Sequence, residues 1–152
     1  MRKEHKELLI KDLSARLPYA VYVEHTPTGV MGALHEMRVY PCYKDDDIDD
    51  YICLIDFFED EKYIDIEHIK PFLFPLSSMT EEQKEEYQGI VNYISVDDTD
   101  NWAEGEFIYV NRYIDRRNNF EKLLHFYNKH HIDYRGLIPK NLANDATGKN
   151  IY

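Results

Sequence analysis

The stretch HIKPFLFPLSSMTEEQ (residues 68–83) divides the chain into two parts of different character. Its first half is apolar, and Pro71 and Pro75 flank the triplet Phe-Leu-Phe. Proline is disfavoured in the interior of a helix and in a central strand, because it lacks an N–H donor and fixes its backbone angle. We therefore predict an extended apolar strap over residues 68–78 that is laid across a sheet and bridges the two parts.

A helix is predicted directly after the strap. Thr80 and Gln83 have the spacing of a capping box, in which each side chain bonds the backbone N–H of the other residue. This pattern predicts a helix over residues 81–93. Three further segments are expected: a polar loop over 95–105 anchored by Trp102, a strand or helix start over 107–110, and a mostly helical segment over 112–131.

Before the strap, the pattern changes from helical to strand-like. Leu9, Leu13 and Leu17 recur at four-residue steps, which predicts a helix over residues 3–16, and Pro18 ends it. Short alternating or β-branched runs then predict strands at 19–25, 30–43, 51–58 and 63–66, with turns at 26–29 and 59–62. The fold expected is α+β, with a small antiparallel sheet or open barrel, an N-terminal helix and C-terminal helices.

The length of 152 residues fits a single domain, 1–152, with the helix, β meander and strap in 1–78 and a mainly helical part in 79–152. Charge is unevenly spread: residues 21–110 hold five Lys/Arg and 22 Asp/Glu, whereas residues 111–152 hold eight and four. An acidic middle repels nucleic acid, and a basic end can attract an anion. The chain shows neither a signal-peptide pattern nor a membrane-spanning run, so we expect a cytoplasmic protein.

Two cysteines, Cys42 and Cys53, lie in apolar segments that are predicted to be strands. Their spacing matches neither a zinc ribbon nor a redox dithiol. Free thiols in a reducing cytosol are the favoured interpretation, and a cross-strand disulfide between the two remains open.

No motif in the sequence names a reaction. The acidic runs at 45–50 and 97–100 lack the central glycine of a calcium loop. His125, His130 and His131 lie near Asp133, but their spacing differs from the four-residue step of metal-binding histidines on one helix. Nucleophile elbows and phosphate-binding loops are also missing. We therefore expect no catalytic residue, no metal and no cofactor.

The stretch KHHIDYRGLIPK (residues 129–140) has a geometric interpretation. The helix should end near its histidines, Gly136 offers a left-handed backbone position, and Pro139 blocks further helix. Two apolar residues should enter the core, and Asp133 should pair with Arg135 or leave one of the two for a ligand. The apolar residues are Leu137 and Ile138.

Arginine and tyrosine gather in the basic end of the chain. Guanidinium groups beside aromatic faces suit a nucleotide or a phosphate. The ligand-binding residues predicted on this basis are Arg112, Tyr113, Arg116, Arg117, His130, Tyr134 and Arg135.

Two stretches, HIKPFLFPLSSMTEEQKEE (68–86) and KHHIDYRGLIPKNLA (129–143), resemble a group of small proteins encoded by gut bacteria, their mobile elements and their phages. That group shares a KPYLRPLSSMT-like strap and an HHFDYRGLI-like end. The match is poor in the acidic middle, and Phe72 and Phe74 stand where tyrosine and arginine are usual. No activity is established for the group, so the resemblance implies a setting and assigns no residue a role.

Three functions are consistent with these features. The first is a non-enzymatic binding protein, in this setting a counter-defence factor that sequesters a small anionic, nucleotide-like signal. The second is an acidic protein-binding inhibitor or DNA mimic that docks on a host protein. The third is a small hydrolase of unknown type. Direct nucleic-acid and membrane partners are not expected, and homo-oligomerisation is left open.

Overall fold

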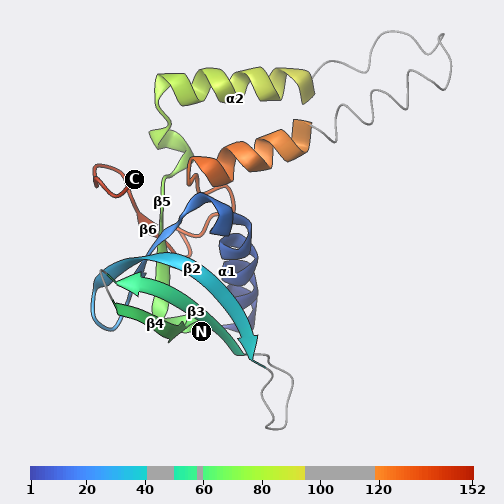
Figure 1. The fold of residues 1–152 in the computed structure, drawn as a ribbon. Coiled ribbons are helices and arrows are strands. Elements are labelled where there is room, and N and C mark those ends of the chain that lie inside the picture. The colour runs from blue at the N-terminus through green and yellow to red at the C-terminus, as the bar shows by residue number, and fades with distance from the viewer. Residues whose placement is uncertain (41–49, 58–59, 95–118) are drawn as a thin grey trace, which may run out of the picture.

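The computed structural model describes residues 1–40, 50–57, 60–94 and 119–152, and Figure 1 shows their arrangement. In chain order the named elements are α1 (Lys3–Arg16), η1 (Leu17–Tyr19), β1 (Tyr22–His25), β2 (Val30–Tyr40), β3 (Asp50–Phe57), β4 (Asp60–Asp65), η2 (Ile66–His68), β5 (Ile69–Leu73), η3 (Leu76–Ser78), α2 (Glu81–Ile94) and β6 (Asn144–Asp145). One more helix covers residues 119–129. The helix at 3–16 and the four strands before the strap are thus confirmed, although β4 already begins inside the turn predicted at 59–62.

The sheet is open and mainly antiparallel. Its strand order is β4-β3-β2-β1-β5-β6, and only the two-residue β6 runs parallel to its neighbour. The β1–β2 hairpin turns at residues 26–29, where Gly29 adopts the left-handed backbone angle that the turn requires (φ +70°). Helices together with an open antiparallel sheet confirm the α+β class.

The strap prediction was wrong for its first half. Residues 69–73 do not lie across the sheet but form β5, an internal strand between β1 and β6. In an antiparallel ladder, hydrogen-bonded residue pairs alternate with pairs that are not hydrogen-bonded. Thr26 N–H donates to His68 C=O, so the pair Thr26–His68 is hydrogen-bonded, and the pair Val23–Pro71 is not. Pro71 is therefore tolerated, because an N–H at its position would not bond β1. On its other side β5 pairs with β6 only from Phe72 onward, so the missing N–H costs no ladder bond.

The core lies between α1 and one face of the sheet (Figure 1). Leu9 and Leu13 of α1 are fully buried, whereas Leu17 is only partly buried. The other core residues come from the sheet, from the residue before β1, from η2 and from the segment 137–143: Val21, Val23, Leu34, Ile64, Ile66, Ile69, Leu73, Leu137, Leu142 and Ala143. Leu137 enters this core as predicted, and Ile138 packs against it.

The predicted capping box begins α2. The Gln83 N–H donates to Thr80 Oγ1 (3.2 Å), and the Thr80 N–H donates to Gln83 Oε1 (3.0 Å). Past this point α2 lies beside the 119–129 helix, as Figure 1 shows, with the Tyr87 ring 6.0 Å from Phe126 and 6.1 Å from Tyr127.

Several predictions lie outside the described residues. They are the loop at 95–105 with Trp102, the segment 107–110, the first part of the 112–131 helix, Cys42, and the acidic runs at 45–49 and 97–100. Cys53 lies in β3, in register with Met37 and Ile64, so its pairing with Cys42 stays a prediction.

Candidate functional site

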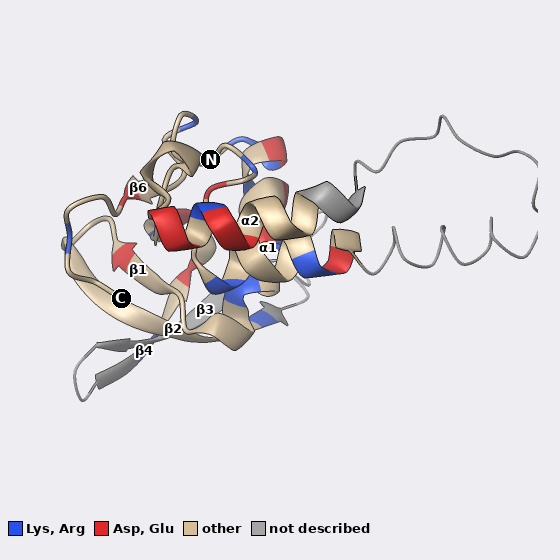
Figure 2. Ribbon diagram, turned by 90° about the horizontal axis from the view of Figure 1, so that it is seen from above, with Lys and Arg blue, Asp and Glu red and all other residues tan. Residues whose placement is uncertain are grey.

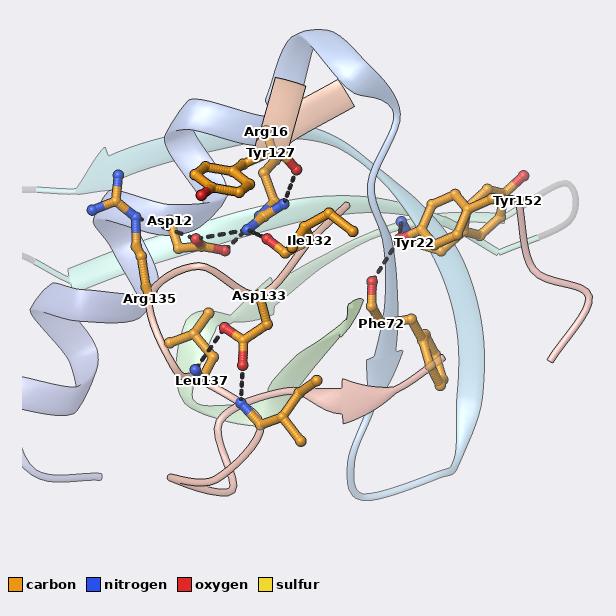
Figure 3. A network of polar contacts seen from close by, with 11 residues as sticks. Asp12, Arg16, Tyr22, Phe72, Tyr127, Ile132, Asp133, Arg135, Leu137 and Tyr152 are labelled. Atoms are coloured by element: carbon orange, nitrogen blue, oxygen red, sulfur yellow. Dashed lines mark hydrogen bonds and ion pairs between the residues drawn. The ribbon is translucent and has the colours of Figure 1, made fainter. Parts of the chain in front are cut away.

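Two charged residues of α1 are buried completely. Asp12 and Arg16 are both 0% exposed, and the Arg16 guanidinium donates to both Asp12 oxygens through Nε (2.7 Å) and Nη2 (3.1 Å). The pair also contacts the far end of the chain, because Arg16 donates to the carbonyls of Tyr127 (3.3 Å) and Ile132 (2.8 Å). These groups and Arg135 form what we call the polar junction (Figure 3).

The Arg16 contacts fall on the end of the 119–129 helix. That helix closes with two backbone bonds, Ile132 N–H to Tyr127 C=O (2.8 Å) and His131 N–H to Asn128 C=O (3.2 Å), in the pattern of a Schellman motif. The left-handed residue that this motif needs is His131 (φ +53°), which the sequence analysis did not identify as left-handed, although it predicted the helix end near this histidine. Gly136 is also left-handed (φ +67°), but it serves the following turn.

Arg135 and Tyr134 complete the polar junction from the C-terminal side. Arg135 Nε lies 3.3 Å from Asp12 Oδ1 as an ion pair, and its guanidinium lies 4.6 Å from the centre of the Tyr134 ring. The opposite guanidinium, of Arg16, lies 5.4 Å from that ring, and Tyr127 stacks on Tyr134 (4.9 Å, 12°). Two guanidinium groups thus share one carboxylate, which leaves one positive charge in excess beside two parallel phenol rings.

Two polar atoms of this group have no hydrogen-bond partner among the described residues: the Tyr134 hydroxyl and Arg135 Nε, which is close to Asp12 without being aligned to it. Burial, together with a contact to Tyr87, raises the pKa of Tyr127, so its phenol is neutral at pH 7. The Arg135 side chain remains 19% exposed. Chemically, this arrangement can offer a planar cation that is held against an aromatic ring to an anion.

Asp133 does not pair with Arg135, contrary to one expectation from the sequence. Its two carboxylate oxygens accept the backbone N–H groups of Leu137 and Ile138, each at 2.8 Å. Asp133 is 7% exposed, so these charge-assisted bonds replace the water that it gives up on folding. Its carboxylate therefore closes the turn that places Leu137 in the core, and Arg135 points to Asp12 instead.

The histidines diverge. His125 Nδ1 is 2.7 Å from the Tyr19 hydroxyl, and His130 lies between Gln83 (3.2 Å) and Glu86 (3.1 Å) of α2. His131 faces a third way and stacks on the Tyr152 ring (3.7 Å, 12°). Within the described parts of the chain, no group of three or more His, Cys, Asp or Glu residues could hold a metal ion.

Of the seven predicted ligand-binding residues, the structure brings Tyr134 and Arg135 together. His130 lies apart from them and links the 119–129 helix to α2. The other four lie outside the described residues: Arg112, Tyr113, Arg116 and Arg117. The sequence analysis missed Asp12 and Arg16, although their four-residue spacing on a predicted helix is the signal of an ion pair.

Comparison with known proteins adds no relative. No protein-family model matches the chain, and neither a curated protein nor a solved structure matches it. In the portion that the structure describes, no helix has the length and apolar character needed to cross a bilayer.

Proposed function

We propose that this chain is a non-enzymatic binding protein that sequesters a small anionic, nucleotide-like ligand at Arg135 and Tyr134. The observation that supports this is the excess positive charge of the polar junction, where two guanidinium groups meet one carboxylate against stacked tyrosines. Arg135 suits a phosphate, because its planar fork matches two phosphate oxygens, and Tyr134 suits a base. Arg16 is fully buried and holds the scaffold.

The biological setting of this proposal rests on the resemblance of residues 68–86 and 129–143 to proteins of gut bacteria and phages. In that setting the protein acts in the cytoplasm of the host cell, where it lowers the concentration of a nucleotide signal used in defence. The predicted residues between 112 and 117 would add cationic and aromatic groups to the same basic end of the chain.

Titration calorimetry with cyclic nucleotides and ADP-ribose-type nucleotides tests the proposal. We expect at least one to bind, and we expect Arg135→Gln to weaken it by about tenfold or more, which corresponds to about 1.4 kcal/mol. Lys122→Gln is the matched control, because it removes one exposed positive charge from the neighbouring helix and should change the affinity less than twofold. Absence of heat for every nucleotide would rule the proposal out.

A second candidate is an acidic inhibitor of a basic host protein. The first turns of α2 expose Glu81, Glu82, Glu85 and Glu86, and Figure 2 marks the acidic positions of this helix in red on the ribbon, with blue at Lys84 between them. Affinity of this kind should fall steeply with added salt. One variant replaces Glu82 and Glu85 with lysine, and a second also reverses the charges of the acidic run at 45–50. Each should abolish capture of the partner, whereas nucleotide binding at Arg135 should persist.

A further inference from the structure

The ring of Tyr152 is enclosed by three other rings. It stacks on His131 (3.7 Å, 12°) and meets Tyr22 (5.7 Å, 78°) and Phe74 (5.8 Å, 52°) at an angle. We name these three rings, with the Tyr22 N–H and the Phe72 C=O, the tyrosine cage. Figure 3 shows Tyr152 beside Tyr22 with its hydroxyl directed at Phe72.

The Tyr152 hydroxyl takes the place of a ladder bond between β1 and β5. Every second residue pair of an antiparallel ladder is hydrogen-bonded. The pair Thr26–His68 is hydrogen-bonded, and Tyr22–Phe72 lies four residues further along each strand, so a hydrogen bond from Tyr22 N–H to Phe72 C=O is expected there. Instead, the hydroxyl accepts from the Tyr22 N–H (3.3 Å) and donates to the Phe72 C=O (2.7 Å). The cage therefore provides one donor and one acceptor at the distance that a phenol bridges.

The walls of the cage are fixed by bonds that do not involve Tyr152. His131 is held by the helix end and by its C=O, which accepts the Phe74 N–H (2.9 Å). Phe74 in turn accepts the Asp133 N–H (2.8 Å), and Tyr22 is held in register with Ala33 of β2. A site whose walls are fixed in advance loses little entropy when a ring enters it.

The occupant is held less firmly than the walls. The Tyr152 hydroxyl is buried, but the residue as a whole is 43% exposed, and residues 147–150 are all exposed. Among the described residues, the backbone N–H groups of Lys149 and Ile151 bond only within the tail, to Ala146 and Lys149. Beyond Ala146, whose N–H bonds Leu73, the tail is attached through the Tyr152 side chain and through Lys149 Nζ, 4.9 Å from the centre of the Phe72 ring.

The chemistry of the cage selects a neutral phenol. Burial, then the nearby charges of Arg16 and His130, lower the pKa of His131 to about 4, so its ring is uncharged at pH 7. Burial raises the pKa of Tyr152, which keeps the hydroxyl protonated and able to donate. A ring without a hydroxyl would leave the Tyr22 N–H and the Phe72 C=O unpaired, at a cost in affinity.

We propose that the tyrosine cage is a binding site for a para-substituted phenol such as a tyrosyl side chain, and that Tyr152 is its exchangeable occupant. The ligand can be a free phenol or a tyrosine carried by a peptide, including the tail of a second copy of this chain. Either ligand bridges Tyr22 and Phe72 in place of Tyr152.

The test uses the full chain with Tyr152→Gly, which empties the cage. We expect p-cresol to bind with a Kd on the order of 1 mM and to raise the Tm by about 3 °C at ten times that Kd. The isostere p-xylene should bind at least tenfold more weakly, and the unmodified chain should respond to p-cresol more weakly than the variant, because Tyr152 competes for the cage. Equal shifts for both compounds, or an equal response of the unmodified chain, would overturn the proposal.

A second arm separates the two sources of phenol. The peptide Lys-Asn-Ile-Tyr copies residues 149–152, and Lys-Asn-Ile-Phe is its control. Tighter binding of the tyrosine peptide than of p-cresol assigns the site to peptide-borne tyrosine, and equal binding assigns it to free phenols. Binding of the phenylalanine peptide as tight as that of the tyrosine peptide would contradict the role of the hydroxyl.

A third variant keeps the test decisive if Tyr152→Gly does not fold. Tyr152→Phe fills the cage with a ring but removes the hydroxyl. Hydrogen exchange at the Tyr22 amide should then accelerate at least tenfold, while the Leu137 amide, held by Asp133, keeps its rate. An unchanged rate at Tyr22 would show that the hydroxyl does not serve as a ladder bond and would overturn the proposal.

Discussion

Two neighbouring faces of α1 are equally buried, but one contributes apolar packing and the other makes specific polar contacts. Leu9 and Leu13 pack against apolar side chains of the sheet. Each adds about 2 kcal/mol to the free energy of unfolding, because its apolar surface is removed from water. Arg16, paired with Asp12, donates to two backbone carbonyls more than a hundred positions later in the chain. The apolar face supplies stability without direction, whereas the polar junction accepts only a segment that presents its carbonyls at the right places.

The largest expected effect comes from breaking the polar junction on one side. Arg16→Met should lower the free energy of unfolding by about 3–5 kcal/mol, because it leaves a buried carboxylate and two buried carbonyls with fewer donors. Urea unfolding measures this loss. The double variant Asp12→Leu/Arg16→Met also removes the buried carboxylate, so it should recover part of the lost free energy of unfolding. If the double variant is less stable than the single one, the comparison between the two faces fails.

The apolar face provides the contrast. Leu13→Ala should also be costly, at about 2–5 kcal/mol, because it leaves a cavity. Combining it with Asp12→Leu should give a sum rather than a rescue, since the two side chains have separate sets of partners.

A pH titration acts on the polar side of this region alone, because the apolar face does not titrate. The pKa of His131 falls from 6.5 to about 4 in the folded chain, so between these values the unfolded state takes up a proton that the folded state refuses. Stability due to the neutral ring is therefore complete above pH 6.5 and is lost as the pH falls towards 4, by at most about 3 kcal/mol.

The control for this titration is His131→Asn, which tolerates the left-handed backbone angle but does not titrate. Urea midpoints from pH 7 to pH 4.5 should fall more steeply for the unmodified chain than for the variant. Arg16, His130 and Tyr152 surround His131 in both proteins, so the difference between the two curves isolates its ring. Parallel curves would contradict the prediction.

Local patterns predicted the features that depend on local chemistry. The α1 helix, the turn at 26–29, the capping box of α2 and the burial of Leu137 could all be predicted, because each depends on residues within a few positions. The strand β5 could not be predicted in this way. A proline is tolerated in a strand only where its missing N–H would not have bonded a partner strand. That alternation is set by pairing with β1, far away in the sequence.

The candidate site shows the same limit. Tyr134 and Arg135 could be predicted together because they are neighbours in the chain. Asp12 and Arg16 could not be recognised as buried, because charged side chains on a helix indicate a solvated face unless distant partners are known. His130 was grouped with the site by sequence proximity, but the helix end directs its ring towards α2.

An intermediate effect is expected at Asp133, which is a buried polar contact made entirely within one turn. Asp133→Ala should cost about 2 kcal/mol, because two buried amides lose a charged acceptor. Asp145→Ala is the matched control. Asp145 also accepts a backbone N–H, that of Thr147 at 2.8 Å, but it is exposed, so its loss should cost well under 1 kcal/mol. Equal losses in urea unfolding would mean that burial does not set the cost.

The smallest effect tests a polar contact that water can replace. Thr80→Ala removes one half of the capping box of α2 and should cost about 1 kcal/mol, because Thr80 is exposed and the freed Gln83 N–H can bond water. Lys84→Ala, which breaks only the exposed pair with Glu81, should cost less than about 0.5 kcal/mol. If Thr80→Ala proves as costly as Asp133→Ala, exposed and buried polar contacts stabilise this fold alike, and the special role of the polar junction is lost.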